Sequence, residues 1–275
     1  MAILFSGDFH ANAGIELNSI TEKTLLKKHG QELYDRIKYH IILGDGGFMR
    51  PADSSKTDLL NYKTLAGRPF PILCVLGERE PVYGMKDVQE TDIGIGETVY
   101  QISEKPFVAY LKRGKVYTID GVKFLVLGGA LSMNINKRKH DGTWWETEYW
   151  SEQEKRDLFK LLETENWFAF VLSHTGPHHI NKILFEHIYP DSEKFKDEVA
   201  FLNDEIHDKI QFCEWLCGHW HRDEYYRDKE TGRGYDYFYR RTKALVSEGG
   251  NIRIYDENQY EFFRNYTVPL EEKQS

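Results

Sequence analysis

Five short apolar runs in this chain are each followed, within two residues, by an Asp, Glu or His, and this pattern restricts the possible folds most strongly. Ala2 to Ser6 leads to Asp8, and Tyr39 to Leu43 leads to Asp45. The other three runs are 71–76, 168–173 and 212–217, and they lead to Glu78, His174 and His219. Such runs predict buried strands. Because ligands gather at the carboxyl ends of parallel strands, we expect these five side chains to converge at one sheet edge.

Helical segments alternate with these strands. Two capping-box patterns begin helices, one from Ser19 to about Gly30 and one from Ser151 to about Glu163, and further helices are predicted at 58–66 and 192–210. Asp120-Gly121 predicts a hairpin between strands at 116–119 and 122–127. Further strands are predicted at 235–240, 243–246, 252–255 and 260–263, and 81–97 is interpreted as a loop or lid.

This alternation predicts an α/β protein, with two mixed sheets packed together and helices on the outer faces, in a four-layer α/β/β/α sandwich. With 275 residues, of which 40% are hydrophobic, we expect one domain spanning 1–275. Cys74, Cys213 and Cys217 do not form a disulfide framework and are interpreted as reduced core residues.

Charge and hydropathy limit the partners. The formal net charge of −8 argues against a nucleic-acid partner, although a local positive site can still hold phosphate. The opening MAILFSGDFH lacks a basic segment and a long apolar segment, and no apolar stretch is long enough to span a bilayer. We therefore expect a cytoplasmic protein that does not interact with membranes. The sequence does not indicate an oligomeric state.

Two further histidine motifs complete a set of candidate metal ligands. His10 follows Asp8 at a spacing of two, and His221 follows His219 at the same spacing. An imidazole offers one neutral nitrogen, and a carboxylate can bridge two cations. A set of His and Asp residues is therefore what a dinuclear hydrolytic site requires.

The motifs resemble those of the calcineurin-like metallophosphoesterases, whose blocks are D-x-H, G-D, G-N-H-[DE], a lone His and G-H-x-H. This chain has GDFH at 7–10, LGDGG at 43–47, LGERE at 76–80, LSHTGP at 172–177 and CGHWH at 217–221. The segments LVLGGALSMN and WWETEYWSEQE are similar to those of uncharacterised bacterial and phage members. The resemblance extends over the whole catalytic framework.

The resemblance implies two divalent metal ions. It places Asp8, His10, Asp45 and His221 on the first metal, and Asp45, His174, His219 and the residue at position 78 on the second. Asp45 would bridge the metals, and a hydroxide shared by them would attack phosphorus in a phosphomonoester, phosphodiester or phosphoanhydride. These mixed N and O ligands suit manganese, iron, zinc or nickel.

The third block departs from the family pattern, because Glu78 and Arg79 replace its Asn and His. With Asp8, Asp45 and Glu78 ionised, two divalent cations would keep a net charge of about +1 instead of about +2. Arg79 restores that charge and can grip phosphate, so we give it a catalytic and a substrate-binding role beside Asp45. Arginine cannot protonate a leaving group, which predicts slow turnover of alkyl phosphates.

Two interpretations of this departure remain open. One is a working hydrolase of phosphoric esters, with an activity that the substitution would reduce. Its substrate would be a phosphorylated small molecule or a phosphoprotein. The other is a degenerate metal-binding relative, with weak or no hydrolysis, that acts as a binding module.

Several other polar and aromatic residues are candidates for substrate contact. Asn12 follows the first block, and Arg138 follows the strand at 122–127, so both are predicted to reach substrate. His178 or His179 would serve as a substitute acid, or both are loop histidines that face water. The aromatic cluster of Trp144, Trp145, Tyr149 and Trp150 would stack a nucleobase or an aryl group, or it packs a core or lid.

Overall fold

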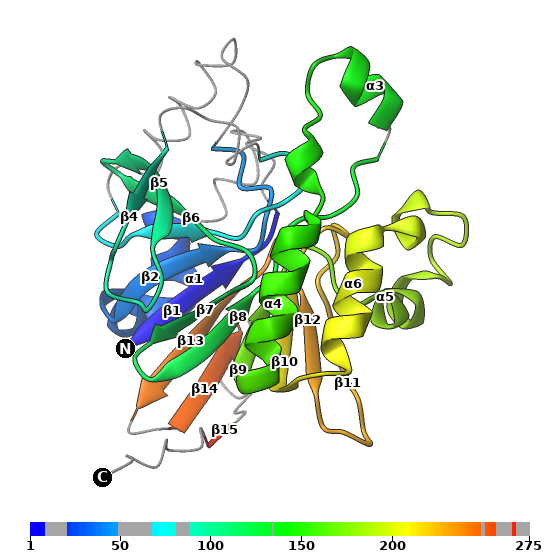
Figure 1. The fold of residues 1–275 in the computed structure, drawn as a ribbon. Coiled ribbons are helices and arrows are strands. Elements are labelled where there is room, and N and C mark those ends of the chain that lie inside the picture. Colours follow the sequence, from blue (N-terminus) through cyan, green and yellow to red (C-terminus); the bar gives the residue numbers. More distant parts are fainter. Residues whose placement is uncertain are drawn as a thin grey trace.

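A computed structural model of the protein describes residues 1–8, 21–48, 68–80, 88–133, 135–248, 251–256 and 266–267. Within these ranges the chain forms two mixed β-sheets, with helices beside them (Figure 1). No helix in the described ranges is long and apolar enough to cross a membrane.

The larger sheet has four parallel strands at its centre. These are β1 (Ala2–Ser6), β2 (Ile37–Ile42), β3 (Ile72–Cys74) and β6 (Phe107–Leu111). Antiparallel strands extend it on one side, β13 (Thr242–Glu248), β14 (Asn251–Asp256) and β15 (Tyr266–Thr267), and on the other, β5 (Val99–Glu104) and β4 (Gln89–Thr91). Because β1, β2 and β3 are parallel, the residues that follow them lie at one sheet edge.

The smaller sheet also has a parallel centre. Its strands are, in spatial order, β11 (Glu224–Arg227), β12 (Gly234–Tyr237), β10 (Gln211–Cys217), β9 (Trp167–Leu172), β8 (Val122–Val126) and β7 (Lys115–Ile119). β8, β9, β10 and β12 are parallel, and β7 and β11 pair antiparallel at the two margins. The loops after β9 and β10 therefore leave the sheet at one edge as well.

An apolar core joins the inner faces of the two sheets. Phe5 of β1 lies 6.4 Å, between ring centroids, from Phe124 of β8, and Phe124 stacks on Phe170 of β9 at 5.4 Å. All three rings are buried in one cluster that draws residues from both sheets. Removing this apolar surface from water is the main term that holds the sheets face to face.

Helices cover the outer faces. Leu158 of α4 (Glu152–Thr164), Phe185 of α5 (His178–Phe185) and Ile206 of α6 (Glu198–His207) share a buried cluster with residues of the smaller sheet. On the larger sheet, Leu25 and Tyr34 of α1 (Glu22–Asp35) are buried with residues of β1 and β13. The predicted α/β class with two mixed sheets and four layers is confirmed.

Much of the predicted element order is confirmed. β1 has the predicted bounds, the predicted hairpin is β7 and β8, and the strands before His174 and His219 are β9 and β10. Ser151 caps α4 in the predicted capping box, with its hydroxyl accepting from the Glu154 backbone N–H and the Glu154 carboxylate accepting from the Ser151 N–H. The predicted helix at 58–66 and strand at 260–263 lie outside the described residues.

Other boundaries differ from the predictions. Thr21, not Ser19, caps α1, and the helix continues to Asp35 after a non-helical Gly30 (φ 77°). The predicted helix at 192–210 is interrupted by Asp197, whose buried carboxylate accepts from the Val199 N–H and starts α6. Its first part is a 3₁₀ turn, η4 (Glu193–Lys196).

The predictions missed several elements, among them β4, β5, β6, β11, β15 and α5. Part of the predicted loop at 81–97 forms β4, and residues 81–87 lie outside the described residues. β5 and β6 were not predicted, and β5 is mostly half-buried, without clean alternation. α5 begins after Pro177 with no side-chain cap, so its sequence lacks a start signal.

Candidate metal centre

The loops that follow the parallel strands of both sheets are connected to one another by hydrogen bonds. Within the larger sheet, the Leu43 N–H donates to the Ser6 carbonyl at 3.0 Å. Within the smaller sheet, the Gly218 N–H donates to the His174 carbonyl at 2.9 Å. Between the sheets, His174 Nδ1 lies 2.8 Å from the Leu43 carbonyl oxygen. The predicted convergence of these loops is therefore observed.

Glu78, His174 and His219 form one compact group of potential ligand atoms. A carboxylate oxygen of Glu78 and one ring nitrogen from each histidine all lie within 4.8 Å of one another, and all three residues are buried. Glu78 Oε2 is 2.7 Å from His174 Nε2 and 3.5 Å from His219 Nδ1. Such a set of one oxygen and two imidazole nitrogens suits a divalent transition metal.

The orientation of His174 follows from its contact with Leu43. Since the Leu43 carbonyl oxygen accepts a hydrogen bond, His174 Nδ1 carries the proton that it receives. Nε2 is therefore the nitrogen that faces Glu78, and its lone pair becomes available when the ring is neutral. Metal-bound histidines commonly have their second nitrogen fixed in this way.

Asp45 is fixed beside this group by two close backbone approaches. The Arg79 N–H donates to Asp45 Oδ1 at 3.1 Å. A Cβ on Gly77 would lie 2.1 Å from the same oxygen, and a Cβ on Gly44 would lie 2.1 Å from His174 Nδ1. Only glycine fits at these two positions, so the glycines in the motifs LGDGG and LGERE serve close packing of the site.

Asp8 and His221 form a second pair at the same edge. His221 Nε2 lies 3.2 Å from Asp8 Oδ2, and the His221 ring stacks on Tyr239 at 5.0 Å between centroids. Asp8 is buried, whereas the His221 side chain is 44% exposed, so this side of the site is open to solvent. His10 and Asn12 lie outside the described residues, and their predicted roles stay predictions.

Backbone strain is concentrated at the candidate ligands. Among the described residues, positive φ at a non-glycine position occurs at Asp45 (49°), His219 (67°), His221 (51°) and Asp120 (54°). Asp120 lies in the hairpin turn between β7 and β8, where this conformation is common. The other three are candidate ligands, and strained backbone tends to occur at functional sites.

Glu80 joins the loops that carry Asp45 and Glu78. Its two carboxylate oxygens accept from the Gly46 N–H and the Gly77 N–H, each at 2.8 Å, and the Tyr110 hydroxyl donates to it at 2.8 Å. Burial and the nearby Asp45 raise the pKa of Glu80 to about 7. This acidic residue of the third block therefore joins two loops through its hydrogen bonds.

Burial disfavours the charged forms of Glu78, His174 and His219, but Glu78 and His174 stabilise each other's charged form. Although burial favours the neutral acid, the charge and hydrogen bond of His174, together with a hydrogen bond from His219, hold the pKa of Glu78 well below its usual range. Burial lowers the pKa of His174, but the hydrogen bond that its ring donates to the Glu78 carboxylate outweighs burial and raises the pKa to about 10. Burial and Lys194 lower the pKa of His219 to about 3, so this ring is neutral.

Arg79 lies at the rim of the site. Its Nε is 3.6 Å from Asp45 Oδ2 and 3.9 Å from Glu78 Oε1, and its side chain is 57% exposed. The guanidinium therefore adds positive charge beside two of the candidate carboxylates while most of it faces solvent. This position is compatible with the predicted phosphate contact, which stays a prediction.

Arg138 makes a set of contacts that sequence reasoning missed. Two of its N–H groups donate to the Glu78 carbonyl oxygen at 3.2 Å, and its Nη2 lies 2.9 Å from Glu148 Oε1. The Ser132 hydroxyl donates to the other Glu148 oxygen at 2.5 Å. Arg138 therefore holds the backbone of a candidate ligand, and its predicted contact with substrate stays a prediction.

Lys194 contacts the loop of His219, although the sequence did not single this lysine out. Its ammonium donates a hydrogen bond to the His219 carbonyl oxygen and lies 5.4 Å from the centroid of the Trp220 ring. Burial lowers its pKa, while the charges of Glu78, Asp8 and Asp45 act in the opposite direction. A lysine within a highly charged segment gives no sequence signal for such a contact.

The two histidines considered as a substitute acid lie on a helix. His178 and His179 begin α5, so the interpretation as loop histidines is wrong. His179 Nδ1 lies 2.7 Å from Asp204 of α6, and the His178 ring lies 4.2 Å from that of Phe201, also of α6. Both rings thus contact a neighbouring helix, and the acid role stays a prediction.

Comparison with known proteins gives structural likenesses only. No model of a protein family matches the chain, and no curated protein matches it. Solved structures that it resembles include phosphopantetheinyl hydrolase (PptH) from Mycobacterium tuberculosis, with 12% identity over 87% of this chain and 90% of that chain and a TM-score of 0.43.

Two further likenesses are similar in extent. Vps29 from Entamoeba histolytica, solved with zinc, is 11% identical over 93% of this chain and 91% of that chain, with a TM-score of 0.35. A predicted phosphoesterase from Streptococcus pneumoniae TIGR4 is 8% identical over 97% of both chains, with a TM-score of 0.33. Because all three TM-scores are below 0.5, we assign roles from the residues of this chain alone.

Proposed function

We propose that this protein is a metal-dependent phosphoesterase that hydrolyses a phosphomonoester, phosphodiester or phosphoanhydride. The observation that carries the proposal is the buried group of Glu78, His174 and His219, whose ligand atoms lie within 4.8 Å of one another. A phosphorylated small molecule or a phosphoprotein is the proposed substrate. The cytoplasm is the proposed compartment.

The donor set fits two divalent cations. Asp8, His10, Asp45 and His221 would hold the first, and Asp45, Glu78, His174 and His219 would hold the second. Among the described residues, the buried Nε2 of His219 has no hydrogen-bond partner. A buried polar atom left in this way costs about 1–3 kcal/mol, which a bound metal would offset.

When bound, such cations neutralise phosphoryl oxygens and lower the pKa of a coordinated water molecule. Asp45 would keep its orientation through the Arg79 N–H, and His174 through the Leu43 carbonyl oxygen. The exposed guanidinium of Arg79 would bind a second phosphoryl oxygen. Since Arg79 cannot donate a proton, aryl esters and anhydrides should react faster than alkyl esters.

Metal binding and hydrolysis are tested together with one matched pair of variants. Asp45→Asn removes the proposed bridging charge, and Asp120→Asn makes the same change at a residue with nearly the same φ, 54° against 49°, in a distant hairpin turn. We expect wild type and Asp120→Asn to bind Mn²⁺ in calorimetry and to hydrolyse an aryl phosphate. Asp45→Asn should lose at least about 10²-fold in kcat/KM and bind Mn²⁺ more weakly. Equal activity of both variants would refute the proposal.

A second candidate function is a metal-binding module without hydrolysis. The 2.7 Å pair between Glu78 and His174, and Arg79 beside Asp45, favour this alternative because these contacts already compensate the buried charges. Wild type that binds Mn²⁺ but hydrolyses neither aryl nor alkyl phosphates would support it. The double substitution Glu78→Asn with Arg79→His restores the family pattern. If the alternative holds, this double variant should gain activity that wild type lacks.

A further inference from the structure

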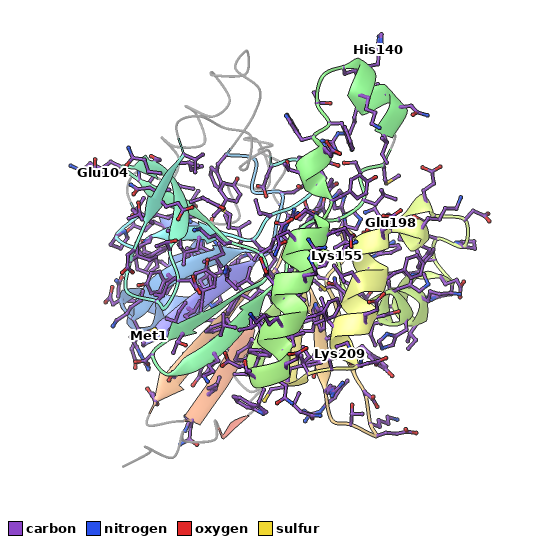
Figure 2. The ribbon with its side chains drawn as sticks, viewed as in Figure 1. Met1, Glu104, His140, Lys155, Glu198 and Lys209 are labelled. Atoms are coloured by element: carbon purple, nitrogen blue, oxygen red, sulfur yellow. The ribbon has the colours of Figure 1, made fainter. Side chains whose placement is uncertain are left out.

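A short basic segment projects beside the proposed phosphoesterase site. We call residues 131–149 the basic arm; it contains α3 (Ile135–His140) and the 3₁₀ turn η3 (Glu146–Glu148), and residue 134 is not described. Lys137, Lys139 and His140 are exposed. Figure 2 shows α3 standing away from the two sheets, with His140 at its outer end. Lys137, Arg138 and Lys139 place three adjacent positive charges on α3, while Asp141, Glu146 and Glu148 bring the formal net charge of the whole arm to zero.

The base of the arm is attached to a candidate metal ligand. Arg138 donates two hydrogen bonds to the Glu78 carbonyl oxygen at 3.2 Å, and the Ser132 hydroxyl approaches the same oxygen at 3.5 Å. The buried carboxylate of Glu148 contacts both Arg138 and Ser132. These contacts fix the arm relative to the site, so a ligand held by the arm would have a defined position relative to the metals.

Two tryptophans on the arm pair with its cations. Lys139 Nζ lies 4.1 Å from the ring centroid of Trp144, and Arg138 Cζ lies 6.0 Å from that of Trp145. Both indoles are half-buried, so part of each remains accessible. A nucleobase can stack on an exposed indole face, and a cation beside the indole attracts the negative phosphates attached to that base. Arg138 links this arrangement to the site, because the same guanidinium contacts Trp145 and the Glu78 carbonyl oxygen.

We propose that the basic arm binds the base of a nucleoside phosphate whose phosphates lie at the metal centre. Trp145 would stack on the base, while Lys137 and Lys139 would attract the phosphate chain. This inference rests on the proposed function for the position of the phosphates. A nucleotide fits better than a phosphopeptide, because the arm offers aromatic faces and cations together, which suit a planar anionic ligand.

Equilibrium binding tests the inference without turnover. The probes are methylene phosphonate analogues, which cannot be hydrolysed, of adenosine monophosphate (the nucleotide analogue), of ribose 5-phosphate and of a phosphotyrosine peptide, each titrated into the full chain with Mn²⁺ in a calorimeter. The second and third probes are named below by their parent compounds. We expect the nucleotide analogue to bind wild type at least about 5-fold more tightly than ribose 5-phosphate. Trp145→Ala should weaken the analogue by about 5- to 150-fold, equivalent to roughly 1–3 kcal/mol, and leave ribose 5-phosphate unchanged.

Further variants distinguish a specific loss of stacking or charge from a general loss of folding. Trp145→Phe keeps a ring and should retain most of the affinity for the analogue. Lys139→Met should weaken the analogue, whereas Lys229→Met, at an exposed lysine of the turn between β11 and β12, should not. Circular dichroism and the urea midpoint of each variant identify one that has failed to fold, and if Trp145→Ala is that variant, Lys139→Met compared with Lys229→Met serves as the test.

The result can separate this inference from the proposed function. Equal affinity for the nucleotide analogue and ribose 5-phosphate, or tighter binding of the phosphopeptide, would overturn it. If the protein binds the analogue through its base but hydrolyses no phosphate ester, the proposed role of the basic arm is supported and only the phosphoesterase proposal is refuted. Hydrolysis of an aryl phosphate with no base-dependent binding would refute only the proposal that the basic arm binds a nucleobase.

Discussion

Replacing Gly44 with alanine tests how closely the loops of the site are packed. Gly44 has φ +86°, and an added Cβ would lie 2.1 Å from His174 Nδ1 and 2.5 Å from its Cγ. The ring is completely buried, and its two nitrogens are held at 2.8 Å by the Leu43 carbonyl oxygen and at 2.7 Å by Glu78. The new methyl group can therefore be accommodated only if His174 moves away from one or both partners.

The expected loss of stability has two parts. Positive φ costs a non-glycine residue roughly 1–2 kcal/mol. Displacing His174 loses a hydrogen bond of about 1 kcal/mol and a charge-assisted one of about 1.5–3 kcal/mol. Gly44→Ala should therefore lower the free energy of unfolding by about 3.5–6 kcal/mol. Metal affinity should also fall, by about 10- to 100-fold, because a ligand has moved.

Gly94→Ala is the matched control. Gly94 has a similar φ of +75°, but an added Cβ would meet no atom within 4 Å, so only the backbone strain remains. Urea unfolding of both variants in EDTA gives the stabilities, and calorimetric Mn²⁺ titration gives the metal affinities. If Gly44→Ala destabilises the protein by no more than Gly94→Ala, within about 0.5 kcal/mol, the proposed fixation of His174 is wrong.

Three further predictions concern pH and a helix cap. In the metal-free protein the pKa of His174 is raised from 6.5 to about 10, so the stability of its pair with Glu78 is complete below pH 6.5 and lost as pH rises through about 10. The urea midpoint in EDTA should fall over that range, and His174→Gln should flatten the slope; an unchanged slope would contradict the pair. Burial raises the pKa of Glu148 from 4.5 to about 7, so its protonated form adds stability below pH 4.5 that is lost as pH rises through about 7. Glu148→Gln should remove this dependence between pH 4.5 and 8, and a slope equal to that of wild type would exclude Glu148 as its source. Ser151→Ala should cost about 1 kcal/mol in urea unfolding without changing Mn²⁺ affinity, because the capping box stabilises only α4, and a weaker metal affinity would contradict this separation.

Local sequence patterns determined the elements that carry the site. The strand before Asp8, the hairpin around Asp120 and the capped helix after Ser151 were predictable because apolar runs, turn dipeptides and capping boxes act over a few residues. The parallel strands then required that the residues after them share an edge. Ligand-type residues after five such strands were therefore enough to predict the convergence of loops at one place.

Only the tertiary structure decided how that place is arranged. The pairing of Glu78 with His174, the clamp of Arg138 on the Glu78 carbonyl oxygen and the contact of Lys194 with the His219 carbonyl oxygen join residues far apart in the chain. α5 has no capping signal of its own, and its apolar face is buried against residues of the smaller sheet and of α6. Such contacts depend on the relative positions of both sheets, which no local pattern encodes. The sequence thus determined which residues meet, while packing of the two sheets decided their partners, protonation and orientation.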